Sequence, residues 1–172
     1  MNILLIGFMG CGKSSLGKKL AKKMSYDFID LDRIIETDEK MTINEIFTSK
    51  GEAYFRNLES QWLDAFKGDN NVIALGGGTP CFGLNMELIN TLGTSVYLQM
   101  NPGLLMDRLY HSKQKRPLIE SFKNDKVILL SKVTELLKER EVFYSKANIT
   151  FEASNMTSTK LGYLIEMINY IK

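Results

Sequence analysis

Residues 2–15 read NILLIGFMGCGKSS, a short apolar run followed directly by the pattern G-x-x-x-x-G-K-[ST]. This pattern is the phosphate-binding P-loop, in which glycines let backbone N–H groups approach phosphate oxygens. Lys13 is expected to reach the β- and γ-phosphates of a nucleotide, and the Ser14 hydroxyl to ligate Mg²⁺. The apolar run predicts a buried strand before the loop, and the periodic apolar residues after it predict a helix. This context argues against the alternative, a Gly-rich turn that binds nothing.

Strand-like and helical segments alternate along the rest of the 172-residue chain. Apolar runs predict strands at residues 2–6, 28–31, 72–75, 95–100 and 148–151. Such alternation is typical of a parallel sheet with helices on both faces, whose ligands bind beyond the carboxyl ends of the strands. Residues 33–70 are expected to form a small helical substrate-binding subdomain, and the polar residues 109–124 a lid. We therefore expect one α/β domain over residues 1–172.

The composition excludes several classes of partner. The net charge is only +2, which gives no electrostatic case for nucleic acid or for a membrane surface. No apolar run approaches the roughly 20 residues of a membrane-spanning helix, and the first residues lack the basic start of a signal peptide. Two cysteines, Cys11 and Cys81, do not make a disulfide framework. We therefore expect a cytoplasmic protein, and we expect it to be a monomer.

Two aspartates, Asp30 and Asp32, close the second predicted strand. Residues two apart on an extended chain point the same way, so both carboxylates should face the P-loop edge. Phosphoryl transfer uses one carboxylate near Mg²⁺ and gains from another that accepts the proton of the attacking hydroxyl. We assign Asp30 to the metal and Asp32 to the hydroxyl. The alternative is that both cap the next helix, with Asp32 as the N-cap residue. Arg33 is expected to be structural, since it could pair with Glu36.

The third predicted strand ends in a glycine triplet, Gly76, Gly77 and Gly78. No carboxylate follows that strand, so Asp30 remains the better candidate for the metal. Bare glycine backbone offers N–H groups to a small ligand. A merely flexible turn is the alternative.

Arginine is scarce in this chain, with five residues against 17 lysines: Arg33, Arg56, Arg108, Arg116 and Arg140. Its planar fork binds carboxylate and phosphate in a bidentate way that lysine cannot reproduce. Arg56 and Arg140, with the glycine triplet, therefore indicate a substrate that carries a carboxylate. Arg116 in the expected lid indicates a clamp on the transferring phosphoryl group. For these three and for Arg108, an exposed salt bridge is the alternative.

Taken together, these segments resemble the shikimate kinase family. The matching stretches run in order along nearly the whole chain: residues 7–14, 28–32, 35–36, 51–52, 55–56, 59, 76–78, 116–118, 140, 144 and 147. The resemblance implies a nucleoside-monophosphate-kinase-like, three-layer fold with five parallel strands in the order 2-3-1-4-5. It also implies transfer of the γ-phosphate of ATP to the 3-hydroxyl of shikimate, in aromatic amino-acid biosynthesis.

The resemblance further implies roles for individual residues. Shikimate would be held by Asp32, Arg56, Gly76, Gly77, Gly78 and Arg140. ATP would be held by Gly10, Cys11, Gly12, Lys13, Ser14, Ser15, Arg108 and Arg116. Mg²⁺ would be held by Ser14 and Asp30, and catalysis would rest on Lys13, Asp32 and Arg116.

Three other readings stay open at this level. Another small-metabolite P-loop kinase, such as one resembling gluconate kinase, would share most of these features. A nucleotide-binding module without chemistry is less consistent with Asp32 and Arg116. A GTPase-type switch would need D-x-x-G and N-K-x-D, and neither string occurs in the chain.

Overall fold

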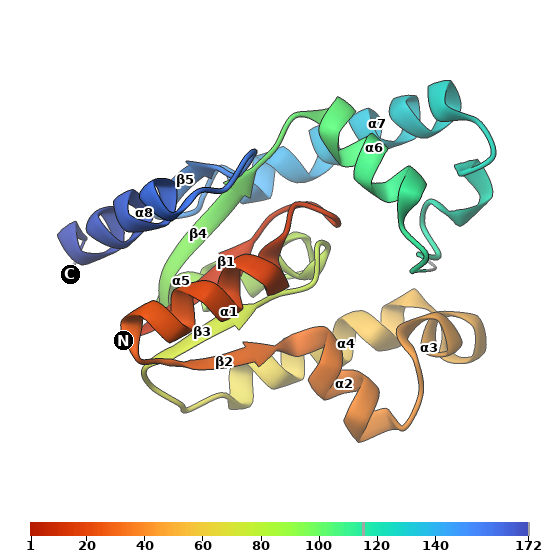
Figure 1. Cartoon of the computed structure of the whole chain (residues 1–172). Helices are drawn as coiled ribbons and strands as arrows, with labels where there is room; N and C mark the ends of the chain where they lie inside the picture. The colour runs from red at the N-terminus through yellow and green to blue at the C-terminus, as the bar shows by residue number, and fades with distance from the viewer. Residues whose placement is uncertain (115, 172) are drawn as a thin grey trace.

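Five parallel strands form the central sheet in the part of the chain that this computed structural model describes, residues 1–114 and 116–171. They are β1 (Asn2–Ile6), β2 (Asp27–Asp30), β3 (Asn71–Ala74), β4 (Gly93–Gln99) and β5 (Ile149–Glu152). Their order across the sheet is β2-β3-β1-β4-β5, which confirms the predicted order. The central strand β1 pairs with β3 and β4, and all of its residues are buried. The carboxyl ends of the strands therefore meet at one edge, where loops can gather ligand-binding groups (Figure 1).

Helices connect the strands and cover the sheet on both sides, with α1 in front and α5 behind in the view of Figure 1. The α-helices of the described residues are α1 (Lys13–Met24), α2 (Leu31–Glu39), α3 (Ile43–Lys50), α4 (Glu52–Ala65), α5 (Asn85–Leu92), α6 (Pro102–His111), α7 (Lys126–Tyr144) and α8 (Ser158–Tyr170). Two short 3₁₀ helices, η1 (Thr79–Cys81) and η2 (Glu120–Phe122), lie in loops. The strands agree with the predicted ones to within two residues at each end, the usual uncertainty of element boundaries.

Local sequence signals explain where several helices begin. Asn101 caps α6 by accepting a hydrogen bond from the Gly103 N–H at 2.8 Å, and Pro follows it at the first helical position. Thr42 and Glu45 form a reciprocal capping box at the start of α3. These caps fix the helices whose neighbouring loops border the site described below.

Two segments depart from simple strand–helix–strand crossovers. The expected subdomain at residues 33–70 contains most of α2 together with α3 and α4. The expected lid at residues 109–124 spans the end of α6 and η2, and Lys115 within it lies outside the described residues. In Figure 1 α2, α3 and the lid segment lie on the same side of the molecule, beyond the carboxyl ends of the strands, whereas α4 leads back toward the amino end of β1, where Asp69 pairs with the N-terminal amine. Whether they act as a subdomain and a lid stays a prediction.

Among the residues that the structure describes, no helix combines the length and apolar character needed to cross a membrane.

Candidate functional site

The P-loop lies between β1 and α1 in the conformation that its glycines permit. Gly7, Gly10 and Gly12 have φ angles of 135°, 84° and 102°, in the region that side chains rarely adopt. Gly12 occupies the N-cap position of α1, and no side chain caps that helix. The free N–H groups of its first turn therefore point into the loop, where the positive end of the helix dipole favours an anion.

The two polar residues of the motif already have partners. The Lys13 ammonium donates to the carbonyl oxygens of Gly7 at 2.7 Å and Phe8 at 3.1 Å. The Ser14 hydroxyl donates to Oδ2 of Asp30 at 2.7 Å. A hydroxyl and a carboxylate thus converge beside the loop, which is the oxygen donor set that Mg²⁺ accepts in combination with phosphate oxygens.

The two aspartates face the cleft, but not for the reason that the sequence suggested. The extended strand ends at Asp30, and Asp32 lies in the first turn of α2, so the argument from strand alternation was wrong. The chain turns helical at Leu31, whose side chain is fully buried in the core. The capping alternative fails too: Asp30 holds the N-cap position, yet its side chain makes no capping hydrogen bond.

Asp32 is the one buried side chain in the described residues with a polar atom that lacks a hydrogen-bond partner. Its Oδ1 atom is inaccessible to solvent and unbonded. Burial, and next the nearby charge of Glu59, raise the pKa of Asp32 to about 7, against the opposing effect of Lys13. A carboxylate with this pKa can hold or release a proton near neutral pH, as a general base requires.

Arg56 is held in place by carboxylates of its own helix, α4. It bonds Glu59 at 2.7 Å and Glu52 at 2.9 Å, and it is 7% exposed. Glu59 is fully buried and also accepts a hydrogen bond from the hydroxyl of Thr79. Burial opposes the charge of Arg56, but these two carboxylates outweigh it and raise the pKa of the guanidinium. Arg56 is therefore a fixed cation rather than a surface salt bridge.

The glycine triplet packs closely against charged side chains, and a Cβ at Gly76 or Gly78 would force its neighbours to move. A Cβ on Gly78 would lie 2.5 Å from Cζ of Arg56, and one on Gly76 would lie 3.1 Å from Oδ1 of Asp32. A Cβ on Gly77 would lie 3.4 Å from the Arg140 guanidinium. The triplet is thus a point of close approach between backbone and charged side chains, not merely a flexible turn.

Two further arginines, Arg140 and Arg116, come from segments that follow β4 in the chain. Arg140 on α7 is 8% exposed, and its guanidinium lies over the Phe8 ring at 5.3 Å. The Arg116 guanidinium donates hydrogen bonds to the Ser112 hydroxyl at 3.1 Å and to the Gln114 side-chain oxygen at 3.0 Å. Burial lowers the pKa of Arg116, and the charge of Asp32 opposes this effect.

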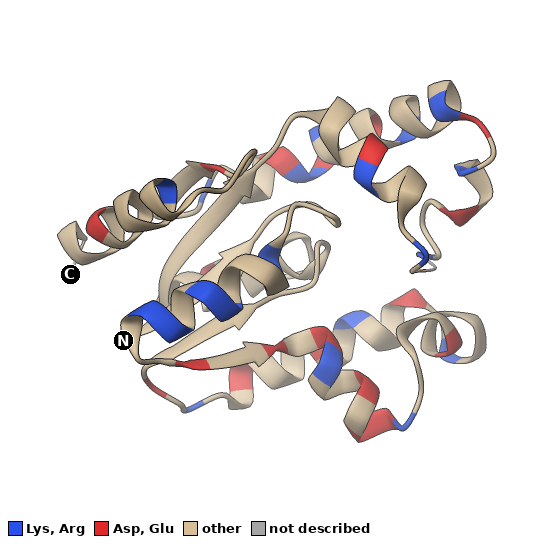
Figure 2. Ribbon diagram, viewed as in Figure 1, with Lys and Arg blue, Asp and Glu red and all other residues tan. Residues whose placement is uncertain are grey.

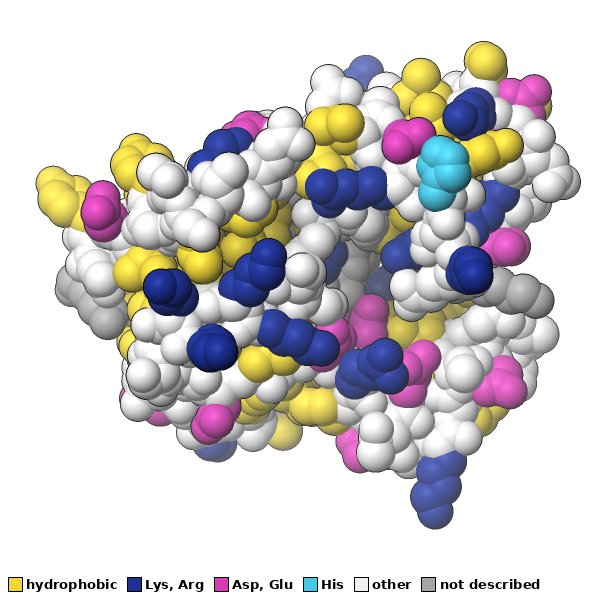
Figure 3. All heavy atoms as spheres, viewed as in Figure 1, with side chains coloured by type: hydrophobic (Ala, Val, Ile, Leu, Met, Phe, Trp, Pro, Cys, Tyr) yellow, Lys and Arg dark blue, Asp and Glu magenta, His cyan; other side chains and the backbone are white. Residues whose placement is uncertain are grey.

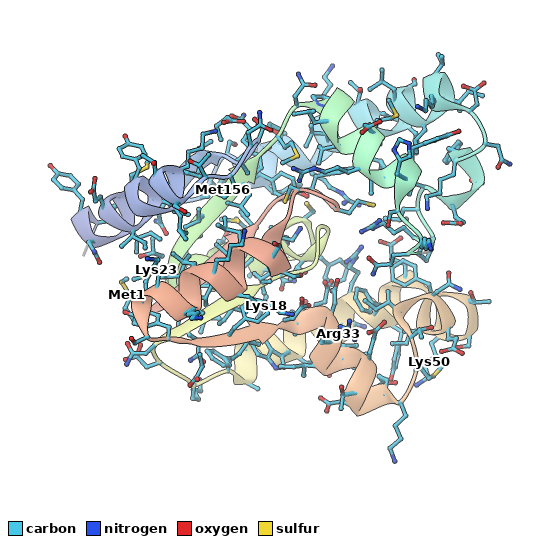
Figure 4. The ribbon with its side chains drawn as sticks, in the orientation of Figure 1. Met1, Lys18, Lys23, Arg33, Lys50 and Met156 are labelled. Atoms are coloured by element: carbon cyan, nitrogen blue, oxygen red, sulfur yellow. The ribbon has the colours of Figure 1, made fainter. Side chains whose placement is uncertain are left out.

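Arg108 and Arg33 complete the set of arginines. Arg108 on α6 donates to the P-loop carbonyl of Gly10 at 3.2 Å. The predicted pairing of Arg33 with Glu36 was wrong, because Glu36 accepts a hydrogen bond from the Ile43 N–H instead. Arg33 is exposed on α2, labelled in Figure 4, and makes no ion pair among the described residues.

All the predicted site residues line one of three adjoining cavities, which share several of their walls. One cavity, named the acceptor cavity after the role that the sequence predicts for its residues, is lined by Asp32, Arg56, Gly76, Gly77, Gly78, Arg116 and Arg140. A second, named the nucleotide cavity on the same basis, is lined by Gly10, Gly12, Lys13, Ser14, Ser15, Asp30 and Asp32, with Gly77 and Arg116 shared. A third cavity, beside the P-loop, is lined by Cys11, Gly12, Ser15 and Arg108. The space-filling view shows the molecule hollowed at this place, with acidic and basic side chains around it (Figure 3).

Sequence reasoning gave no role to several residues in or next to the cavities. Glu59 received no role, although its spacing of three from Arg56 on a helix was a usable signal. The apolar wall of the acceptor cavity was also given no role, because apolar residues usually belong to the core. Its residues are Met9, Ile43, Phe47, Phe55, Pro117 and Leu118. Lys18 and Arg33 also line the nucleotide cavity, from α1 and α2 (Figure 4).

The charges around the cleft come from different elements. Lysines follow α1, whereas acidic residues gather at the end of β2 and along α2 (Figure 2). Asp32 therefore stands between the P-loop lysine on one side and the arginines of the acceptor cavity on the other. This arrangement can orient a hydroxyl toward a nucleotide phosphate and neutralise charge on both substrates.

A P-loop beside a cavity with a buried carboxylate and three arginines defines the protein as a P-loop kinase that acts on a small anionic molecule. The sequence profile described as Shikimate kinase matches residues 9–169. The chain belongs to the shikimate kinase family.

Individual relatives agree with this assignment. The chain is 41% identical over 157 residues to a shikimate kinase of Bacteroides fragilis, covering 91% of this chain and 87% of the relative. The structure resembles a shikimate kinase from Bacteroides thetaiotaomicron with a TM-score of 0.84 and 35% identity, over 99% of this chain and 97% of that one. It also resembles a shikimate kinase from Acinetobacter baumannii in complex with shikimate, with a TM-score of 0.86 and 32% identity over 99% and 94% of the two chains.

Proposed function

We propose that Asp32 is the general base of the reaction that family membership assigns to this chain, the ATP-dependent phosphorylation of shikimate. The observation that carries this proposal is the buried Oδ1 of Asp32, which lacks a partner where the acceptor and nucleotide cavities meet. We assign a substrate hydroxyl as the hydrogen-bond donor to the carboxylate of Asp32, which lines both cavities. Proton transfer to a positioned base contributes about 10²–10⁴-fold to the rate of such steps.

The step proceeds by in-line displacement at the γ-phosphorus. The 3-hydroxyl oxygen of shikimate forms the new bond as the bond from phosphorus to the bridging oxygen of ADP breaks, and the hydroxyl proton passes to Asp32. Lys13 and Arg116 stabilise the charge that spreads over the phosphoryl oxygens. Lys13 must leave its two P-loop carbonyls to do so, and ATP phosphates are the stronger acceptors because they are charged.

The substrate carboxylate is assigned to Arg56 and Arg140, with the glycine triplet contributing backbone N–H groups. Both guanidiniums line the acceptor cavity and are nearly buried, so their attraction for an anion is weakly screened. The apolar wall of that cavity, exemplified by Phe47, covers the ring of the substrate and excludes water.

The nucleotide is assigned to residues 10–15, with Arg108 and Arg116 flanking it. Ser14 and Asp30 fit an Mg²⁺ ion, since their oxygen atoms already converge at 2.7 Å beside the phosphate-binding loop. Mg²⁺ supplies charge neutralisation on the β- and γ-phosphates. Residues 109–124 are assigned as the lid that carries Arg116 over the phosphates, and residues 33–70 as the subdomain that carries Arg56.

We also propose a cytoplasmic monomer. Cys11 and Cys81 are both free thiols, which suits a reducing compartment. Sedimentation equilibrium tests the monomer, and concentration-dependent mass would contradict it.

A coupled ADP-release assay over a panel of acceptors tests the function. Shikimate should support turnover far above the ATP-only background, whereas gluconate should not. NMR of the product should show phosphate on the 3-oxygen. Background-level ADP release with shikimate, or a better rate with gluconate, would overturn the proposal.

A further inference from the structure

The carbonyl of Gly77 accepts a hydrogen bond from a residue far away in the sequence. The Tyr144 hydroxyl donates to this oxygen at 2.5 Å. Tyr144 is the last residue of α7 and lies four positions after Arg140, so the two side chains project from one face of the helix. The phenol thus connects the helix that carries Arg140 to the glycine triplet.

Tyr144 is held rigidly behind the triplet. Its side chain is fully buried, and its ring packs against Tyr97 of β4 with centroids 5.0 Å apart. It is not among the residues that line the acceptor cavity. Burial raises the pKa of the Tyr144 phenol, against the opposing effect of Arg140, so the hydroxyl remains a donor at all working pH values.

Peptide geometry transmits this bond to the cavity. In a planar trans peptide the carbonyl and the following N–H point in opposite directions, and the described chain has no cis peptide. The Gly78 N–H therefore points away from Tyr144. In the described residues the N–H groups of Gly76, Gly77 and Gly78 make no backbone hydrogen bond, although all three glycines line the acceptor cavity. Free donors in such a loop keep their direction only if something fixes the peptide planes.

We propose that Tyr144 is a positioning residue for the acceptor, because its hydroxyl holds the Gly77 carbonyl and thereby orients the Gly78 N–H, in the same peptide plane, toward shikimate. This inference rests on the proposed role of the triplet as a substrate contact. It assigns Tyr144 to substrate affinity, through backbone geometry, rather than to the chemical step or to ATP.

Tyr144→Phe tests this role, and Tyr97→Phe is the matched control. Both changes remove one hydroxyl from the same pair of buried rings in contact, but the Tyr97 hydroxyl donates to Glu141 at 2.7 Å rather than to the triplet. Tyr144→Phe should raise the KM and the Kd for shikimate about threefold to tenfold, the affinity equivalent of one hydrogen bond. Its kcat and its KM for ATP should stay within about twofold, as should all constants of Tyr97→Phe.

Two results would overturn the inference: an unchanged KM for shikimate in Tyr144→Phe, or equal effects of the two substitutions. Wild-type turnover is measured alongside. Absence of shikimate turnover in the wild-type protein would defeat the proposed function, whereas an active wild type with an unaffected Tyr144→Phe variant removes only the positioning role.

A second measurement needs no substitution that removes the hydroxyl. 3-Fluorotyrosine is placed at position 144, and in a separate sample at position 97. The fluorine resonance at 144 should shift on saturation with shikimate alone, and the resonance at 97 should stay in place. A resonance at 144 that does not respond to shikimate contradicts the inference, even if Tyr144→Phe fails to fold.

Discussion

Replacing Asp32 by Asn should make the protein more stable and almost inactive at the same time. The Asp32 carboxylate is largely buried, and its Oδ1 atom has no partner. Burial, assisted by the charge of Glu59, raises its pKa from 3.8 to about 7. The folded state therefore holds a group that is costly to ionise, and an amide of the same shape carries no such cost.

The direction of the effect with pH follows from proton binding. Between the ordinary pKa of 3.8 and the folded value of about 7, the folded chain keeps a proton on Asp32 that the unfolded chain has released. The stability from this group is fully present below pH 3.8 and is lost as the pH rises through about 7. The difference of about three units, at about 1.36 kcal/mol each, amounts to roughly 4 kcal/mol by pH 8.

Urea unfolding, followed by the fluorescence of the single tryptophan Trp62, measures this difference. The advantage of Asp32→Asn over the wild type should grow by roughly 4 kcal/mol between about pH 4 and pH 8. Asp38→Asn, an exposed change on the same helix, is the control and should show no comparable gain in stability over the wild type. A pH-independent difference for Asp32→Asn, or a variant less stable than the wild type at pH 8, would refute the reasoning.

The catalytic half of the prediction uses the same variants. In Asp32→Asn the kcat should fall about 10²–10⁴-fold while the Kd for ATP stays nearly unchanged. In the wild type, kcat/KM for shikimate should rise toward a plateau above about pH 7, because Asp32 must be ionised to accept a proton. An unchanged kcat would remove Asp32 from the mechanism. Greater stability combined with lost turnover excludes unfolding as the cause.

Three further changes test other parts of the site. Arg56→Lys should raise the KM for shikimate about tenfold or more, with little effect on the KM for ATP. The ammonium of lysine is a point charge and cannot replace the planar guanidinium that Glu52 and Glu59 hold in place. An unaltered KM for shikimate in steady-state assays would refute this. Gly78→Ala should have a similar effect, since its Cβ would lie 2.8 Å from a guanidinium nitrogen of Arg56; Gly162→Ala, with open space around it, should leave the KM unchanged. Ser14→Ala should raise the Mg²⁺ concentration needed for half-maximal rate without changing the KM for shikimate, and an Mg²⁺ titration with an unshifted midpoint would count against the metal site.

Much of the architecture could be predicted from the sequence because it depends on short-range patterns. The P-loop, the alternation of strands and helices, and the scarcity of arginine are all visible in one sequence, and the strand order came with the family resemblance. The residues so selected converge on adjoining cavities because parallel strands deliver their following loops to one edge.

The features that could not be predicted from the sequence depend on packing between distant segments of the chain. No local pattern indicated that the chain turns helical at Leu31, whose side chain is fully buried in the core. The hydrogen bond from the Ile43 N–H to Glu36 was equally unpredictable, and Arg33 does not form the expected pair with Glu36. The contact from Tyr144 to Gly77 spans 67 positions and leaves no periodic trace in the sequence.

The two buried carboxylates beside Gly76 show how the fold separates a structural charge from a reactive one. Glu59 is compensated by Arg56 and Thr79, so its charge is satisfied within the protein. Asp32 receives no such partner at Oδ1, although this atom lies beside the same glycine, on the side where a Cβ would also meet Glu59. An unpaired buried carboxylate persists only if the surrounding fold supplies the energy to hold it. The proposed role of Asp32 as general base supplies a reason for keeping such a group, because the carboxylate lines both cavities and a substrate hydroxyl can serve as its partner there.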